Sequence, residues 1–237
     1  MAKDLSTIMI NSPTAFAQAF DVSHETLAEL QKYADLVRHW QKAVNLVAPS
    51  TLEHLWHRHI ADSAQLVALI PAKARTFADI GSGGGFPALV LAIMLADART
   101  PRTFSMSLIE SDQRKSAFLR EVIRQTGLKT LGNVVEILSM RIEKSETHAK
   151  VGAVDVVSAR ACASLDRLFQ YAYPLFHADT VALFLKGRDS QREIAEAQAH
   201  WTFSTRLIPS RTDPDATIVE VRHLSPRSDS PEHQSEG

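Results

Sequence analysis

The sequence predicts an α/β protein in which a seven-stranded, mainly parallel sheet follows an N-terminal helical extension. From Arg75 onward, short apolar runs alternate with amphipathic segments, as in successive βα units around a parallel sheet. Before Pro71, the expected hinge, apolar residues instead recur at spacings of three and four, which is typical of amphipathic helices. The 237 residues, 45% of them hydrophobic, are enough to build one sizeable core.

Residues 1–71 are expected to form the helical extension. A stripe that is apolar at all but one position predicts its first helix: Leu27, Leu30, Ala34, Val37, Gln41 and Val44. Ser23 is the expected N-cap of this helix. Ser50 and Glu53 form a capping-box pattern, in which each side chain can bind a free amide at a helix start, and they predict a second helix that runs to about His59.

Residues 72–224 are expected to form the main domain. The strands are predicted at Thr76–Ile80, Phe104–Ile109, Val134–Leu138, Val154–Ser158, Val181–Leu185, Phe203–Ile208 and Thr217–Val221. The helices are predicted at Pro87–Leu95, Gln113–Thr126, Leu165–Tyr173 and Arg192–His200. The short separation of the last two strands favours an antiparallel hairpin. Residues 225–237, rich in Ser, Pro, Asp and Glu, cannot bury enough apolar surface to fold, so they are predicted to be a disordered tail.

The overall composition narrows the possible functions. No run approaches the roughly 18 apolar residues of a membrane span, and Met1–Ile10 lacks the apolar core of a signal peptide, so a cytoplasmic protein with no membrane partner is expected. A single cysteine, Cys162, cannot form an internal disulfide, which agrees with a reducing compartment. A net charge of -1 and a pI near 6.8 argue against coating nucleic acid by bulk electrostatics. Any nucleic-acid contact must use a local patch.

The first motif with chemical meaning is the glycine-rich turn after the first strand, DIGSGGGF. A turn with so little side-chain bulk lets a nucleotide-like cofactor approach the backbone at the start of the next helix. Phe86 stands where a dinucleotide-binding fingerprint has its third glycine, so the GxGxG spacing resembles the methyltransferase version and predicts S-adenosylmethionine. A loop that merely turns the chain is the alternative. The candidate contacts are Asp79, Gly81, Ser82, Gly83, Gly85 and Phe86.

An acidic residue, Glu110, ends the second predicted strand. A carboxylate in this place can accept hydrogen bonds from both ribose hydroxyls of a nucleoside. It follows Gly81 by 29 residues, more than the roughly 20 of dinucleotide sites, and the loop Asp97–Arg102 accounts for the excess. A solvated loop residue or a helix cap is the alternative, but the pairing with the glycine turn favours the ribose.

Two further strand ends carry candidate contacts. Ile142 and Glu143 follow the third strand, where this architecture usually grips adenine through backbone amides and an apolar contact. Arg160 follows the fourth strand, at the carboxyl edge where open α/β sheets bind ligands. Its guanidinium is expected to contact the carboxylate of the cofactor, to hold an RNA phosphate, or simply to pair with Asp155 or Asp166.

Together these motifs resemble the ribosomal RNA small-subunit methyltransferase G (GidB) family. The resemblance runs in order from about Leu30 to Val221. It rests on Asn45-Leu46, Arg58-His59-Ile60-Ala61-Asp62-Ser63, the DIGSGGGFP turn, Leu108-Ile109-Glu110-Ser111 with Lys115 and Phe118-Leu119, Arg141-Ile142-Glu143, Ser158-Ala159-Arg160-Ala161 and Leu185-Lys186-Gly187. Such an ordered series is far more specific than any one motif.

The resemblance implies a class I S-adenosylmethionine-dependent methyltransferase with a Rossmann-like fold. It implies methyl transfer to N7 of a guanine in 16S rRNA, so the expected partner is 16S rRNA or the small ribosomal subunit. It places the cofactor contacts on Gly81, Phe86, Ile142, Glu143 and Arg160. Two departures from the family pattern are Ala88, where a glycine is usual, and the basic pair Arg114-Lys115, which keeps the charge.

The acceptor chemistry agrees with what the sequence lacks. It has no Asn-Pro-Pro or Asp-Pro-Pro motif for amino-group methylation and no Pro-Cys pair for attack on a pyrimidine. Cys162 is expected to be a small core residue. Guanine N7 has a free lone pair at neutral pH, so no catalytic base is named. A methyltransferase of a small molecule or protein stays open, as does a nucleotide-binding oxidoreductase or regulatory module, which Phe86 disfavours.

Basic residues near the expected site are candidates for RNA binding. They are Lys186 and Arg188 after the fifth strand, and Arg114 and Lys115 on the second main-domain helix. The charges on that helix are equally well explained as an ordinary solvated face. The neighbouring histidines lack HExxH spacing, so no metal is expected. His59 and Asp62 are expected to join the extension to the main domain, and nothing demands more than a monomer.

Overall fold

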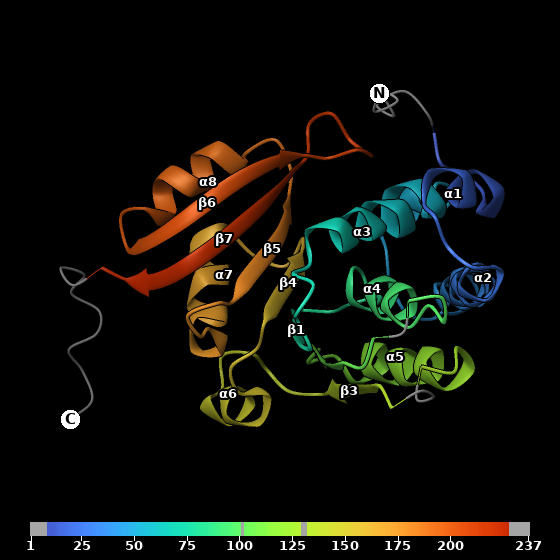
Figure 1. Ribbon diagram of the computed structural model, residues 1–237, viewed down its shortest axis with the longest axis horizontal. Coiled ribbons are helices and arrows are strands. Elements are labelled where there is room, and N and C mark those ends of the chain that lie inside the picture. The colour runs from blue at the N-terminus through green and yellow to red at the C-terminus, as the bar shows by residue number, and fades with distance from the viewer. Residues whose placement is uncertain (1–8, 101, 129–131, 228–237) are drawn as a thin grey trace.

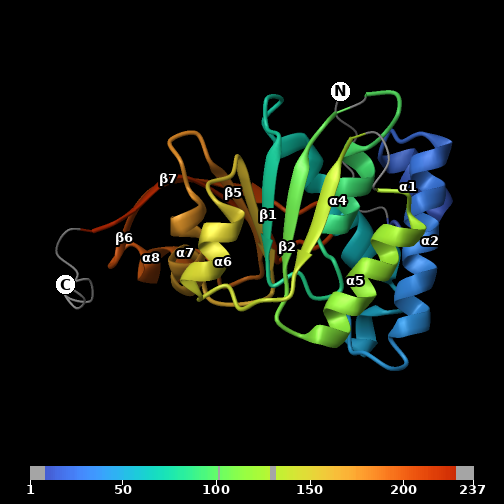
Figure 2. The same cartoon turned by 90° about the horizontal axis from the view of Figure 1, so that it is seen from below.

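The computed structural model describes residues 9–100, 102–128 and 132–227, which contain one seven-stranded sheet in the order β3-β2-β1-β4-β5-β7-β6. Strands β1 to β5 pair in parallel, and β7 runs antiparallel to both β5 and β6. Helices cover both faces of the sheet (Figures 1 and 2). The predicted α/β class and the antiparallel hairpin at the edge are therefore confirmed.

The strands lie close to the predicted apolar runs. They are β1 (Thr76–Ile80), β2 (Ser105–Ile109), β3 (Val134–Leu138), β4 (Val156–Arg160), β5 (Val181–Lys186), β6 (Trp201–Pro209) and β7 (Thr217–Pro226). Strand β4 lies two residues later than predicted and so includes Arg160. Strand β7 continues to Pro226, inside the predicted tail, because its end pairs with Trp201 of β6. Residues 228–237 of that tail lie outside the described residues.

The main-domain helices form two layers (Figure 2). Helices α4 (Ala88–Leu95) and α5 (Gln113–Gln125) share one face of the sheet with the N-terminal helices. Helices α6 (Ser145–Val151), α7 (Leu165–Ala172) and α8 (Ser190–Ala197) lie against the other face. The sequence did not predict α6, because its seven mainly polar residues make only about two turns, bury only Thr147 and carry no apolar stripe.

The extension begins with two capped helices, α1 (Pro13–Ala19) and α2 (His24–Trp40). Helix α1 was not predicted. The predicted cap of α2 is confirmed, since the Ser23 side chain accepts a hydrogen bond from the amide of Thr26 at 3.1 Å. Helix α2 ends before Gln41, whose side chain instead binds the backbone of Val47.

The predicted capping box at Ser50 is wrong. A single 3₁₀ turn, η1 (Pro49–Thr51), forms there without a side-chain cap, because the amide and hydroxyl of Thr51 both donate to the carbonyl oxygen of Ala48. The second helical region starts later, as a π-helical turn η2 (Trp56–Ala61), and continues through α3 (Asp62–Ala64) and η3 (Gln65–Leu69). It therefore extends well beyond the predicted end near His59.

The extension and the main domain share one hydrophobic cluster. Phe16 of α1 and Tyr33 of α2 belong to the same cluster as Leu89 of α4 and Phe118 of α5, and all four side chains are fully buried. Burying one such side chain is worth about 1.5–3 kcal/mol, so several of them hold the extension firmly against the sheet.

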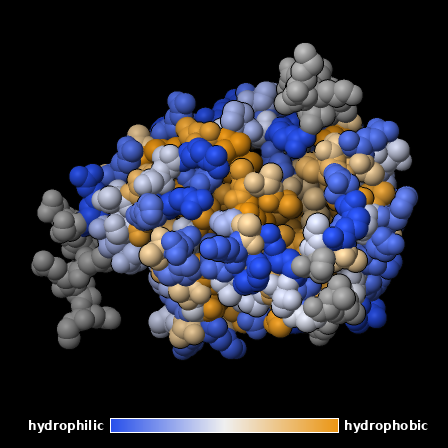
Figure 3. Space-filling model, viewed as in Figure 1, coloured by the Kyte–Doolittle hydropathy of each residue, from blue (hydrophilic) through white to orange (hydrophobic). Residues whose placement is uncertain are grey.

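On the face viewed in Figure 3, apolar residues gather near the centre and hydrophilic residues surround them. Within the described parts of the chain, no helix is both long and apolar enough to cross a membrane.

Candidate active site

The carboxyl ends of the parallel strands meet at one edge of the sheet, where the strand order reverses between β1 and β4. Open α/β sheets bind ligands at such a switch point. One cavity here, the glycine cavity, has a volume of about 200 Å³ and is lined by residues that include Gly81, Glu110, Ile142, Glu143, Cys162 and Tyr171. A second, the arginine cavity, has about 220 Å³ and is lined by residues that include Arg58, His59, Asp62, Arg160, Lys186 and Asp213.

The glycine turn needs its glycines for both conformation and space. Gly81, Gly83 and Gly85 have φ angles of +67°, +55° and +88°, in the left-handed region that side chains disfavour. A Cβ at Gly81 would lie 3.0 Å from the Cβ of Cys162, and one at Gly85 would lie 2.5 Å from a methyl of Leu89. Of these three glycines, Gly81 lines the glycine cavity, whereas Gly85 lies against Leu89 and Tyr33.

Glu110 supports this turn from the neighbouring strand. Its side chain is buried and accepts hydrogen bonds from the amides of Gly83 at 2.8 Å and Asp112 at 2.7 Å. The helix-cap alternative is wrong, because Asp112 caps α5. A carboxylate has about four acceptor positions, so Glu110 keeps capacity for a ligand in the cavity that it lines.

Asp79, the next-to-last residue of β1, has an unpaired side-chain oxygen. Its Oδ1 accepts a hydrogen bond from the Ser158 hydroxyl at 2.6 Å, whereas its buried Oδ2 has no partner among the described residues. Burial raises the pKa of Asp79 to about 6. Buried polar atoms are nearly always paired, so this unpaired oxygen is an exception next to the glycine turn. Ser82, by contrast, turns its hydroxyl to the carbonyl oxygen of Asp79 at 3.2 Å.

The opposite wall of the glycine cavity holds the two residues predicted after the third strand. The Ile142 side chain is buried, and Glu143 accepts a hydrogen bond from the Tyr171 hydroxyl at 3.1 Å. Hydrogen bonding to its own backbone amide and to Tyr171 lowers the pKa of Glu143. The structure thus brings Ile142 and Glu143 together with Gly81 and Glu110 around one cavity.

Cys162 also lines this cavity, so its expected place in the core is wrong. Ala161 has a φ of +51°, and this left-handed turn after β4 leaves Cys162 exposed beside Gly81. Desolvation of the thiol raises the pKa of Cys162 to about 11, so the thiol stays protonated at neutral pH. The turn at Ala161 and Cys162 separates the glycine cavity from the arginine cavity.

Arg160 is held by the N-terminal extension. Its guanidinium donates to the carbonyl oxygen of Arg58 at 3.0 Å and to Nδ1 of His59, and it lies 3.5 Å from the carboxylate of Asp62. It also lies over the ring of Phe86, 5.2 Å from the ring centroid. The expected link between the extension and the main domain through His59 and Asp62 is therefore confirmed.

The alternative partners of Arg160 are wrong. Asp155 accepts from the amide of Thr76 at 2.9 Å, and Asp166 accepts from the indole of Trp201 at 3.0 Å. A strand rises about 3.3 Å per residue, so β4 carries Arg160 roughly 16 Å from Asp155. Asp166 lies on α7, on the far side of the sheet from the extension.

His59 orients the guanidinium as a neutral ring. Burial and the nearby cation Arg160 lower the pKa of His59 to about 3. Because Nδ1 accepts from Arg160, the proton lies on Nε2, which is 2.7 Å from the hydroxyl of Thr51. The ring also contacts Phe86, with centroids 5.1 Å apart.

Tyr33 is a site residue that sequence reasoning missed. Its hydroxyl donates a hydrogen bond to the carbonyl oxygen of Gly84, and its ring stacks on Phe86 at 5.1 Å. The available signal was the buried helical face Thr26, Leu30, Tyr33 and Val37, at spacings of four, three and four, which runs beside the predicted apolar stripe. A polar tip on such a face needs a partner when buried.

The candidate RNA-binding cations lie in different settings. Lys186 is only 9% exposed, and its ammonium binds the carbonyl oxygen of Ala163 at 2.9 Å and the carboxylate of Glu193 at 2.6 Å. Arg188 is 78% exposed and lies 3.4 Å from Asp215. Breaking a buried pair on one side costs about 3–5 kcal/mol, whereas an exposed pair is worth about 0–1 kcal/mol. Lys186 is thus bound in place, and Arg188 is free to exchange partners.

Arg114 and Lys115 lie away from the arginine cavity, in the first turn of α5. Arg114 is largely exposed and lies 3.7 Å from Asp112, and Lys115 is half-buried. Over the residues that the structure describes, no three His, Cys, Asp or Glu side chains are grouped so that they could hold a metal ion.

The chain is similar to one known family over most of its length. Residues 26–215 match the family described as rRNA small subunit methyltransferase G. The ribosomal RNA small subunit methyltransferase G of Parvibaculum lavamentivorans is 49% identical over 210 residues, which cover 89% of this chain and 88% of that protein. The protein of the same name from Gluconobacter oxydans is 45% identical over 200 residues, 84% of this chain and 95% of that protein.

Solved structures share the fold at low identity. The O-methyltransferase from Bacillus cereus in complex with SAH has a TM-score of 0.54 and 13% identity, covering 89% of this chain and 96% of that one. Magnesium protoporphyrin IX methyltransferase from Synechocystis, with bound SAM, has a TM-score of 0.52 and 11% identity, covering 80% and 96%. The predicted class I methyltransferase fold is confirmed. With its matching profile and close relatives, this chain belongs to the rRNA small subunit methyltransferase G family.

Proposed function

We propose that this protein transfers a methyl group from S-adenosylmethionine to N7 of a guanine in 16S rRNA. The observation that carries the proposal is the pair of adjoining cavities in a member of this family. The glycine cavity has the features of a nucleoside site, and the arginine cavity beside it is lined by cations that suit RNA.

The residues of the glycine cavity fit the cofactor. Glu110 would accept the ribose hydroxyls, Ile142 and Glu143 would flank the adenine, and the open backbone at Gly81 would admit the chain that joins them. The unpaired Oδ2 of Asp79 would accept from the cofactor's ammonium group. Bound S-adenosylmethionine supplies a methyl group on a positively charged sulfur.

The chain's own groups favour an acceptor that needs no base. His59 is neutral and uses both ring nitrogens, the Cys162 thiol stays protonated, and the Tyr33 hydroxyl is bonded to Gly84. Guanine N7 offers a lone pair without deprotonation. Catalysis then consists of holding N7 in line with the methyl group, which can supply a large part of the rate by proximity alone.

The walls of the two cavities supply that alignment. The extension packs Arg160 against Phe86. The turn at Ala161 lies between the glycine cavity and the arginine cavity. Rigid packing of these groups would keep the acceptor aligned with the cofactor.

Labelled S-adenosylmethionine tests the proposal when it is supplied with small subunits that lack the modification, bare 16S rRNA, total protein and a metabolite extract. We expect label in 16S rRNA only. The labelled guanosine should permit chain cleavage after borohydride reduction and aniline treatment, which marks N7. Label confined to protein or metabolites would overturn the RNA acceptor, and absence of cofactor binding in calorimetry would overturn methyl transfer itself.

A further inference from the structure

Four cations around the arginine cavity each pair with one carboxylate, and the pairs fall into two classes. Arg160 with Asp62 and Lys186 with Glu193 are largely buried pairs, with every side chain less than 20% exposed. The pairs Arg58 with Asp213 and Arg188 with Asp215 are far more open. Arg58 is 43% exposed and Arg188 is 78% exposed.

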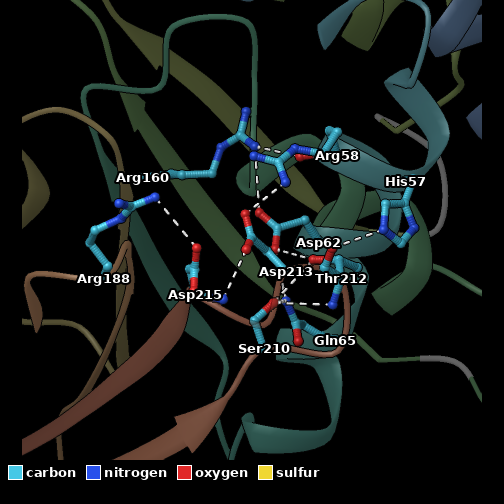
Figure 4. A network of polar contacts seen from close by, with 10 residues as sticks. All are labelled: His57, Arg58, Asp62, Gln65, Arg160, Arg188, Ser210, Thr212, Asp213 and Asp215. Carbon is cyan, nitrogen blue, oxygen red and sulfur yellow. Dashed lines mark hydrogen bonds and ion pairs between the residues drawn. The ribbon is translucent and has the colours of Figure 1, made fainter. Parts of the chain in front are cut away.

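Both open pairs use carboxylates of one short loop between β6 and β7, residues 210–216, called here the acidic loop. Asp213 lies 2.7 Å from the guanidinium of Arg58, which comes from η2. Asp215 lies 3.4 Å from the guanidinium of Arg188, which follows β5. Figure 4 shows the two arginines reaching the loop from different elements. The acidic loop thus neutralises the two exposed cations from a single point.

The acidic loop is itself anchored to the helical extension. The Thr212 hydroxyl donates to Asp62 at 2.7 Å, and His57 Nε2 donates to the Thr212 carbonyl oxygen at 2.8 Å. The side-chain oxygen of Gln65 accepts a hydrogen bond from the amide of Arg211 at 2.9 Å. These contacts hold the loop independently of Arg58 and Arg188, so either arginine can leave its carboxylate without releasing the loop.

We propose that Arg58 and Arg188 bind backbone phosphates of the RNA at the mouth of the arginine cavity, and that Asp213 and Asp215 occupy the place of those phosphates in the free protein. Exposed ion pairs are weak, whereas phosphate accepts two parallel hydrogen bonds from a guanidinium. An RNA strand that presents two phosphates at the right spacing displaces both carboxylates together. A ligand with one anionic group can replace only one of the two carboxylates and so forms fewer ion pairs. The acidic loop therefore favours RNA over small anions.

This inference rests on the proposed RNA substrate, and opposite charge changes test it. The measurement is the dissociation constant for unmodified small subunits, by filter binding from 50 to 200 mM salt. We expect Arg58→Gln and Arg188→Gln each to raise this dissociation constant by about three- to tenfold. Each should also lower the slope of its logarithm against the logarithm of the salt concentration by about 0.7–0.9. We expect Asp213→Asn and Asp215→Asn to lower the dissociation constant. Asparagine at position 213 keeps the oxygen that accepts from the amide of residue 215.

Arg38→Gln and Asp35→Asn are the matched controls, because they form an exposed pair of the same type on α2 and should leave RNA binding unchanged. Thermal unfolding should match the wild type in every variant. If the arginine variants bind subunits like the wild type, or if the asparagine variants bind more weakly, the inference is overturned while methylation by the wild type stands. If the wild type neither binds subunits nor methylates them, the proposed function fails first.

Discussion

The hydroxyl of Tyr33 on α2 donates a hydrogen bond to the carbonyl oxygen of Gly84 in the glycine turn. The N-terminal extension therefore supports the glycine turn as well as the arginine cavity, where His59 and Asp62 hold Arg160. Helix α2 of the extension thus shapes the turn that would meet the cofactor.

Replacing Tyr33 by phenylalanine should weaken cofactor binding by about five- to tenfold. The variant keeps the ring stacked on Phe86 but leaves the Gly84 carbonyl unpaired, and one such bond is worth about 1 kcal/mol. Isothermal calorimetry with S-adenosylmethionine measures the change. Tyr173→Phe, at a partly exposed tyrosine far from the turn, is the control and should bind normally. Equal affinities for the two variants would mean that Tyr33 does not support the turn.

Gly81→Val should abolish measurable cofactor binding. Valine at this position would have to keep a positive φ, which is unfavourable for a branched residue, and its side chain would collide with Cys162. Gly152→Ala separates these two effects, since Gly152 also has a positive φ of +69° but would meet no atom within 4 Å. Gly152 has a ψ of -171°, a conformation nearly confined to glycine, so this control should lose about 1–3 kcal/mol of stability and keep its cofactor affinity. Normal binding by Gly81→Val would remove the cofactor from this turn.

Asp79 should make the stability of the free protein depend on pH. Its pKa is about 6 in the folded protein against an ordinary 3.8, so the folded state binds the proton more tightly than the unfolded state. The free energy of unfolding should therefore fall by about 3 kcal/mol as the pH rises from about 4 to about 6, and this contribution should stay constant above that. Urea denaturation at several pH values measures it.

Asp79→Asn should remove that pH dependence, while the exposed Asp35→Asn should not. In the wild type, cofactor affinity should rise about tenfold from pH 5 to pH 7 as the carboxylate ionises. An unchanged profile in Asp79→Asn would show that the pH dependence arises from another group.

Lys186→Ala should lower the stability and reduce methylation of rRNA while sparing cofactor affinity. The change leaves the largely buried Glu193 carboxylate and the Ala163 carbonyl oxygen without their cation, which costs up to about 3 kcal/mol because Glu193 keeps its bond from the Leu165 amide. The double variant Lys186→Met with Glu193→Gln should regain part of the stability, because it removes the unpaired charge while the glutamine oxygen can still accept from the amide of Leu165.

Methylation by that double variant then separates two roles of the lysine. We expect it to remain low, because the ammonium is lost from the arginine cavity. Full recovery of methylation, followed with labelled cofactor and small subunits, would contradict a contact between Lys186 and RNA.

Much of the fold could be predicted because its signals are local. The apolar runs Thr76–Ile80 and Val134–Leu138 became β1 and β3 without change, and Ser23 caps α2 as its residue type suggests. Two predictions failed because the backbone conformation of a neighbouring residue overrode the expected local pattern. The Ser50 capping box failed because Thr51 closes a tighter turn onto Ala48, and Cys162 left the core because Ala161 adopts a left-handed conformation.

The sequence by itself determined which candidate residues lie at the carboxyl ends of successive strands: the glycine turn, Glu110, Ile142 with Glu143, and Arg160. Parallel strands bring their carboxyl ends to one edge, so residues at strand ends converge without further information. Only the tertiary structure decided which side chains are paired. Arg160 contacts residues about a hundred positions earlier in the chain, and Arg58 meets Asp213, 155 residues later. Such partners depend on how the extension packs on the sheet, and no local pattern encodes that packing.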